Sequence, residues 1–345
     1  MSPKRILVCA PQIPFVRGGA ELQVEQLVRA LRENGFETET VALPFQDYPH
    51  ERLIRSASAW RLLDLDADVV ITTKFPSYFV SHPNKITWLF HNYRGVYDLQ
   101  GTPYSGYSRN RPDDLQLIEW VHKNDREFLQ ESKKLLTISV NVRNRLRKFL
   151  DLDAEVLYAP PPLKDRIRCD AYERFIFAAQ RLDSYKRTDL LIRALALVQN
   201  DVRAVIAGTG PEEAKLHALA KEIGVEDRID FVGKINDEQL IDYYAKCRLV
   251  FFAPFDEDYG LTTLEAFYAR KPVVTANDSG GTLEFVEHQV NGWIAEPEPK
   301  SMATGIQQVL ELAEKMGEAG YQKVKHLSWE KTISRFREIF RDLHL

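Results

Sequence analysis

Cysteine is scarce in this chain of 345 residues, which contains only Cys9, Cys169 and Cys247. The three are far apart in sequence, and their odd number and spacing match neither a disulfide framework nor a zinc site. We therefore expect free thiols, as is usual in a reducing compartment. Cys9 lies in an apolar run, where a buried thiol that packs as a small hydrophobic side chain is predicted.

Long hydrophobic stretches are missing as well. No segment approaches the roughly 18–20 apolar residues that a membrane-spanning helix needs, and the apolar run at residues 6–10 is too short for the core of a secretory signal. We therefore expect a cytoplasmic protein. The chain also lacks a positive net charge, because 46 Lys and Arg are outnumbered by 50 Asp and Glu. This balance argues against a nucleic-acid binder.

The sequence does contain short apolar runs that alternate with amphipathic stretches, in two successive series. Strands of the first series are expected at residues 5–10, 38–42, 68–72, 85–90 and 135–139. Strands of the second are expected at residues 174–179, 202–207, 228–232, 249–252 and 272–275. Such runs suit parallel strands covered on both faces, so the prediction is an α/β fold with two doubly wound, Rossmann-like sheets.

Three consecutive prolines, Pro160 to Pro162, interrupt this alternation within residues 158–165. Proline continues neither a helix nor a central strand, which indicates a linker. We therefore expect an N-terminal domain at residues 1–160 and a second domain at 161–327. A C-terminal helix at 328–345 is expected to pack back toward the first domain. Two such domains are expected to face a central cleft, where ligands commonly bind.

The densest chemical signal lies between residues 253 and 294. An apolar strand there runs into a loop with Glu257 and Gly260, and a helix that carries Glu265 follows. The N–H groups at a helix start bind phosphate well, and glycine lets the backbone approach a ligand closely. Arg181 and Lys186 follow the first strand of the second domain and could neutralise a diphosphate.

At these residues the chain resembles retaining glycosyltransferases of the GT-B fold, family 4 (glycosyl transferases group 1). The family's Glu–seven residues–Glu motif is matched by Glu257 and Glu265, and its Arg–four residues–Lys pair by Arg181 and Lys186. Arg187 departs from the pattern, because family members often have glycine there. The resemblance implies a metal-independent hexosyltransferase that needs no cofactor. It would use a UDP- or GDP-linked sugar and a glycan or lipid-linked acceptor.

The resemblance also implies roles for individual residues. Glu265 would bind the ribose hydroxyls, Glu257 would contact the transferred sugar, and His91 would position its primary hydroxyl. The residues expected in catalysis are Glu257, His91, Arg181 and Lys186. Those expected to bind the donor are Gly18, Gly19, Arg181, Lys186, Gly208, Gly233, Lys234, Glu257, Gly260, Leu261, Thr262, Thr263 and Glu265.

A basic segment at residues 133–148 suggests contact with anionic lipid headgroups at the inner face of a membrane. A solvated basic helix accounts for the same charges. Three other readings of the whole chain stay open: a nucleotide-sugar epimerase, a glycan phosphorylase and a non-catalytic two-lobed sugar-binding protein. An oxidoreductase fits less well, because the first glycine loop lacks the compact Gly-x-Gly-x-x-Gly turn.

Overall fold

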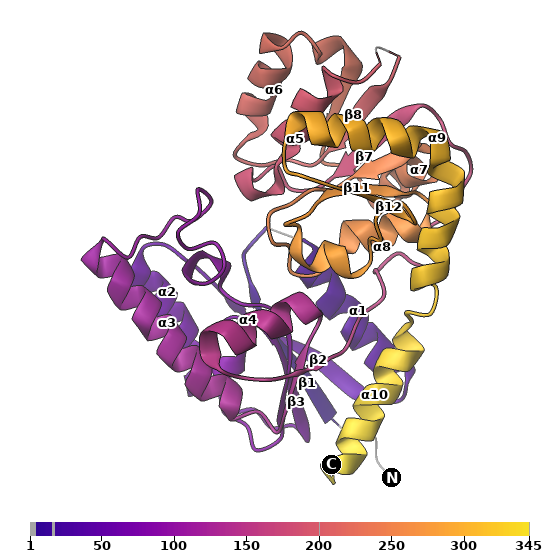
Figure 1. Cartoon of the computed structure of the whole chain (residues 1–345). Coiled ribbons are helices and arrows are strands. Elements are labelled where there is room, and N and C mark those ends of the chain that lie inside the picture. Colours follow the sequence, from indigo (N-terminus) through magenta and orange to yellow (C-terminus); the bar gives the residue numbers. More distant parts are fainter. Residues whose placement is uncertain (1–4, 16–17, 200, 345) are drawn as a thin grey trace. The chain divides into compact units, whose positions relative to one another are not determined.

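The computed structural model describes residues 5–15, 18–199 and 201–344. It divides the chain into two compact units (Figure 1). The first comprises Met1–Pro162 and Leu327–Leu345, and the second comprises Leu163–His326. The boundaries thus fall at 162/163 and 326/327, where the sequence analysis set 160/161 and 327/328.

The first unit is built on a six-stranded parallel sheet in the order β2-β1-β3-β4-β5-β6. Its strands are β1 (Arg5–Gln12), β2 (Glu37–Pro44), β3 (Val69–Lys74), β4 (Lys85–His91), β5 (Lys134–Thr137) and β6 (Glu155–Val156). Its helices are α1 (Gly19–Glu33), α2 (His50–Ser58), α3 (Pro112–Gln130), α4 (Val140–Leu150) and α10 (Trp329–Asp342). Every residue of β3 is buried, as expected for a central strand covered on both faces.

The second unit repeats this plan with a parallel sheet in the order β12-β11-β10-β7-β8-β9. Its strands are β7 (Phe175–Ala179), β8 (Arg203–Ala207), β9 (Ile229–Gly233), β10 (Leu249–Phe251), β11 (Val273–Ala276) and β12 (Gly292–Ala295). Its helices are α5 (Thr188–Leu195), α6 (Glu213–Glu222), α7 (Asp237–Lys246), α8 (Leu261–Tyr268) and α9 (Pro299–Val324). The core is formed by side chains such as Ile176, Phe251, Val274 and Ile306.

The C-terminal helix α10 belongs to the first unit, although the whole second unit separates it in sequence from the rest. Phe336, on its buried face, packs edge-on against Trp88 at 5.6 Å between ring centroids. Arg335 donates to the Glu155 carboxylate at 2.6 Å. The helical spacing of its aromatic residues therefore reflects packing.

The predicted fold class is confirmed. Every strand expected from the sequence is present with ends within two residues of the expected ones, and the fully buried Cys9 lies inside β1. Strands β6 and β12 were not predicted, because two residues of β6 and the Gly-Trp start of β12 carry no strong apolar pattern. Within the described ranges, no helix combines the length and apolar character required to cross a bilayer.

Candidate functional site

The expected donor-site residues of the second unit gather at the carboxyl edge of its sheet. Successive strands run from β7 through β8 to β9 on one side, while β10, β11 and β12 extend on the other. The order therefore reverses between β7 and β10, which is where open α/β sheets bind ligands. Lys186 lies in the loop that follows β7, and Glu257 lies in the loop that follows β10. The topology thus brings two segments about 70 residues apart to one place.

Lys186 and Glu257 form a direct ion pair. The Lys186 ammonium donates to the Glu257 carboxylate at 2.6 Å, and each side chain is only 15% exposed. The ammonium also lies 5.4 Å from the centroid of the Phe252 ring. Charges in such a partly dry setting interact more strongly than they do in water. Lys186 and Glu257, both expected at the donor site, are therefore neighbours at the switch point.

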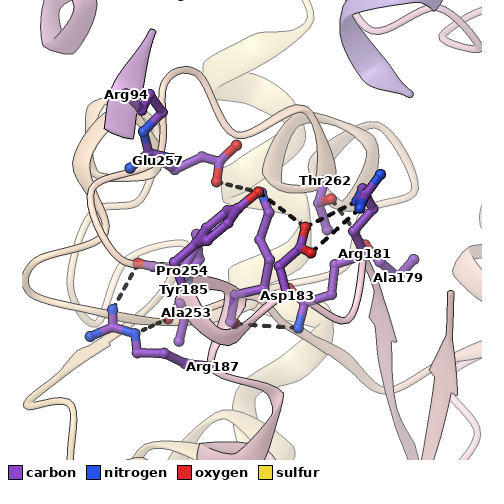
Figure 2. A network of polar contacts seen from close by, with 12 residues as sticks. Arg94, Ala179, Arg181, Asp183, Tyr185, Arg187, Ala253, Pro254, Glu257 and Thr262 are labelled. Atoms are coloured by element: carbon purple, nitrogen blue, oxygen red, sulfur yellow. Dashed lines mark hydrogen bonds and ion pairs between the residues drawn. The ribbon is translucent and has the colours of Figure 1, made fainter. Parts of the chain in front are cut away.

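Arg181, the other expected phosphate ligand, points to a different carboxylate. Its guanidinium donates to Asp183 at 3.0 Å, and the Tyr185 hydroxyl donates to the same carboxylate at 3.0 Å. Figure 2 shows Arg181 and Tyr185 converging on Asp183. The Arg181 side chain is 56% exposed, so its charge faces solvent while Asp183 is 12% exposed. The sequence analysis did not predict the Arg181–Asp183 pair, because a spacing of two residues within a loop does not indicate a contact between side chains.

The helix start expected to hold phosphate begins at Gly260. Its φ of 81° is left-handed, and a Cβ there would lie 2.7 Å from the Thr282 hydroxyl, so only glycine fits. Leu261 and Thr262 open α8, and the first N–H groups of a helix have no acceptor within it. The Thr262 hydroxyl donates to the Ala179 carbonyl at 3.2 Å. Thr263 is fully buried, so its side chain faces the protein.

Glu265 lies one turn into α8 and is partly buried. Burial raises the pKa of its carboxyl from 4.5 to about 7, against the lowering effect of a hydrogen bond from Tyr244. That bond runs from the Tyr244 hydroxyl to the carboxylate at 2.9 Å, and Tyr244 is itself fully buried. Tyr244 reads from sequence as an ordinary core residue of α7, so this partner was missed.

Gly208 and Gly233 shape the neighbouring strand ends. The Gly208 N–H donates to the Gly233 carbonyl at 2.8 Å, which ties the end of β8 to the end of β9. Gly208 has φ 126°, and a Cβ there would lie 1.9 Å from the Gln180 carbonyl oxygen. Gly208 therefore allows close backbone packing beside the loop that carries Arg181, whereas Gly233 has open space around it and a left-handed φ of 63°. Lys234, the next residue along, is exposed.

The first unit holds the remaining expected residues. Gly18 and Gly19 lie at the start of α1, where the Gly18 N–H donates to Glu21 at 2.9 Å. Glu21 also pairs with the buried Lys74, an ion pair that sequence reasoning missed. His91 is partly buried at the end of β4, with its Nδ1 3.0 Å from the Asn92 carbonyl oxygen. The roles of these residues toward a donor stay predictions.

The basic segment at residues 133–148 offers less free charge than its composition indicates. Arg145 is buried and pairs with Asp98 at 3.4 Å, and Arg147 pairs with Asp153 at 2.8 Å. Much of its charge is therefore engaged inside the first unit. Among the described residues, no group of three or more His, Cys, Asp or Glu side chains is arranged to hold a metal ion.

Comparison with known proteins relates the second unit to a described family. Residues 163–326 match the family described as Glycosyl transferases group 1. The chain is 31% identical over 238 residues to alpha-1,3/1,6-mannosyltransferase ALG2 of Dictyostelium discoideum, covering 66% of this chain and 48% of that protein. It spans less than half the length of the curated relatives it matches first.

Solved structures share the fold over almost the whole chain. Sucrose-phosphate synthase from Thermosynechococcus elongatus superposes with a TM-score of 0.77 at 18% identity, covering 99% of each chain. Anabaena HepE in complex with UDP and glucose gives 0.67 at 18% identity, covering 98% of this chain and 100% of that one. The chain thus has the GT-B fold, and its second unit belongs to the family of glycosyl transferases group 1.

Proposed function

We propose that this chain transfers a hexose-type sugar, with retention of configuration, from a nucleotide-diphosphate sugar to an acceptor hydroxyl. The observation that carries the proposal is the ion pair of Lys186 and Glu257 at the switch point, 2.6 Å apart and beside the start of α8. The family of the second unit supports glycosyl transfer in general. HepE is a relative in fold that binds UDP.

The charge that develops during sugar transfer explains why the site contains cations. As the bond between the anomeric carbon and the diphosphate breaks, negative charge develops on the leaving phosphate. Lys186 and the exposed Arg181 supply fixed positive charge for it, and the N–H groups at the start of α8 add hydrogen bonds. These contacts are stronger in the transition state than before it, so they lower the barrier.

Glu257 and Glu265 have different tasks in this proposal. Glu257 contacts the transferred sugar and holds Lys186 in place. Glu265 accepts hydrogen bonds from the ribose hydroxyls. The acceptor hydroxyl attacks the anomeric carbon on the face that the leaving phosphate vacates. A phosphate oxygen takes its proton, so no carboxylate nucleophile is required. His91, Gly18 and Gly19 are proposed to contact the donor sugar from the first unit.

Binding and transfer assays with matched variants test the proposal. UDP, GDP and ADP are titrated calorimetrically, and one of them is expected to bind and raise the melting temperature. The UDP- or GDP-hexose with the matching base is then offered to a panel of glycan and lipid-linked acceptors. Lys186→Ala is expected to lower the rate of transfer by about 10²-fold or more, while Lys215→Ala, which changes an exposed side chain of α6, leaves it intact. No nucleotide binding by the wild type refutes the assignment.

The same assays separate the other candidates. A nucleotide-sugar epimerase converts the donor without an acceptor, and a non-catalytic sugar-binding protein binds sugar without turnover. A glycan phosphorylase needs a pyridoxal group on a lysine, which absorbs near 330 nm. Peripheral membrane contact through residues 133–148 is part of the proposal. Liposome co-sedimentation tests it, since equal recovery with neutral and anionic vesicles removes that contact.

A further inference from the structure

Arg187 follows Lys186 and is buried, with 6% of its surface exposed. Its φ of 53° is left-handed, a conformation that costs a non-glycine residue energy unless its surroundings hold it there. Arg187 is therefore an unusual residue at this position, and its contacts explain how the left-handed conformation is maintained.

The Arg187 guanidinium joins three loops at the carboxyl edge of the sheet. It donates to the Ala253 carbonyl at 2.8 Å and to the Pro254 carbonyl at 2.7 Å, both in the loop after β10. It also binds both oxygens of Asp278, just after β11, at 2.9 and 2.6 Å. Figure 2 shows Arg187 directed at Ala253 and Pro254. Only the planar fork of arginine satisfies acceptors in this arrangement.

Backbone hydrogen bonds close this arrangement into a ring. The Asp278 carbonyl accepts from the Asp256 N–H at 2.8 Å, next to Glu257. The Phe255 N–H donates to the Tyr185 carbonyl at 2.7 Å, next to Lys186. From Lys186 the ring therefore passes through Arg187 and Asp278 to Glu257, and returns through the 2.6 Å ion pair. Lys186 is thus held through its neighbours Tyr185 and Arg187, and Glu257 is held through its neighbour Asp256.

We infer that Arg187 and Asp278 together are positioning residues for the Lys186–Glu257 pair. This inference rests on the proposed function and deepens it. Arg187 contacts neither sugar nor phosphate. It sets the distance between the cation that receives the leaving phosphate and the acid beside the sugar. A misplacement of about 1 Å at a reacting centre can cost about 10²-fold in rate.

Three variants and a control test the inference. Arg187→Lys keeps the charge and loses the fork, and Arg187→Gly removes the side chain but adopts φ 53° without strain. Asp278→Asn keeps the shape and removes the charge. Arg174→Lys is the control, since Arg174 pairs with Asp201 at 2.8 Å on the surface before β7 begins. For each variant we would measure kcat, KM for the donor, nucleotide Kd and the melting temperature.

The expected result is a selective loss of turnover. Arg187→Lys and Arg187→Gly lower kcat by about 10²-fold, whereas Kd for the nucleotide changes by less than about threefold. Asp278→Asn gives a smaller loss, and Arg187→Gly combined with Asp278→Asn is no worse than Arg187→Gly alone, because residues that act as one unit are not additive. The control keeps wild-type kcat.

Two outcomes of these measurements overturn the inference. One is a kcat within about twofold of wild type in Arg187→Gly. The other is a parallel fall of kcat, nucleotide affinity and melting temperature, which indicates a merely structural role.

A crystal structure of Arg187→Gly gives a readout independent of turnover. We expect the Lys186–Glu257 separation to exceed about 4 Å there, beyond the reach of an ion pair, and an unchanged 2.6 Å contact also refutes the idea. A wild type without transferase activity refutes the proposed function, while this distance still decides the positioning role.

Discussion

Glu265 gives the sharpest prediction, because its carboxyl is proposed to act as an acceptor while its environment disfavours the ionised form. Burial raises its pKa from 4.5 to about 7. In the proposed complex ribose hydroxyls donate to the carboxylate, so only the ionised fraction of the protein should bind nucleotide well. That fraction is about 0.1 at pH 6 and about 0.9 at pH 8, and the apparent Kd varies inversely with it. Nucleotide affinity should therefore rise about tenfold between these pH values.

The same pKa fixes the sign of a stability effect. A carboxyl whose pKa is raised by folding contributes stability that is complete below pH 4.5 and is lost as the pH rises to about 7. Above pH 7, ionisation of Glu265 destabilises the ligand-free fold by up to about 3 kcal/mol. Glu265→Gln should thus unfold at a higher temperature than wild type at pH 8, and should bind nucleotide more weakly.

Calorimetry at pH 6, 7 and 8, in buffers with different ionisation enthalpies, measures both quantities. At pH 7 the wild type should release about half a proton on binding. Glu265→Gln reports the titration of the nucleotide's own phosphate and serves as the baseline. A wild-type affinity that follows the pH dependence of Glu265→Gln, with no extra proton released, would show that the carboxylate plays no part in binding.

Three further predictions concern the rest of the molecule. Lys186→Ala should lower kcat by about 10²-fold or more at saturating donor, and an unchanged initial rate would contradict its proposed role. Gly208→Ala should cost about 4 kcal/mol in urea unfolding, because its Cβ would lie 1.9 Å from the Gln180 carbonyl oxygen, whereas Gly224→Ala, with φ 70° and open space around it, should cost about 1 kcal/mol. In the first unit, burial raises the pKa of Asp125 to about 7, so its stabilising effect as a neutral acid is lost as the pH rises toward 7. Between pH 5 and 8, wild type should lose about 3 kcal/mol of stability relative to Asp125→Asn, and parallel melting curves would refute this.

The strand order of each sheet could not be read from the sequence, although the strands themselves could. Apolar runs identify buried parallel strands because both faces of such a strand are covered. Pairing between β7 and β10 depends instead on where the chain crosses the sheet, and several crossovers are compatible with the same runs. That pairing brings the loops of Lys186 and Glu257 together.

The sequence by itself determined the fold class, the two series of strands and the residue types of the candidate site, since these depend on local apolar patterns and short motifs. The tertiary structure decided which charges meet. Glu257 pairs with Lys186, Arg181 pairs with Asp183, and Glu265 accepts a hydrogen bond from Tyr244. The tertiary structure also explains the left-handed backbone of Arg187, since its guanidinium holds together three loops that are distant in sequence. Such partners are set by packing over long sequence separations, and no local pattern encodes them.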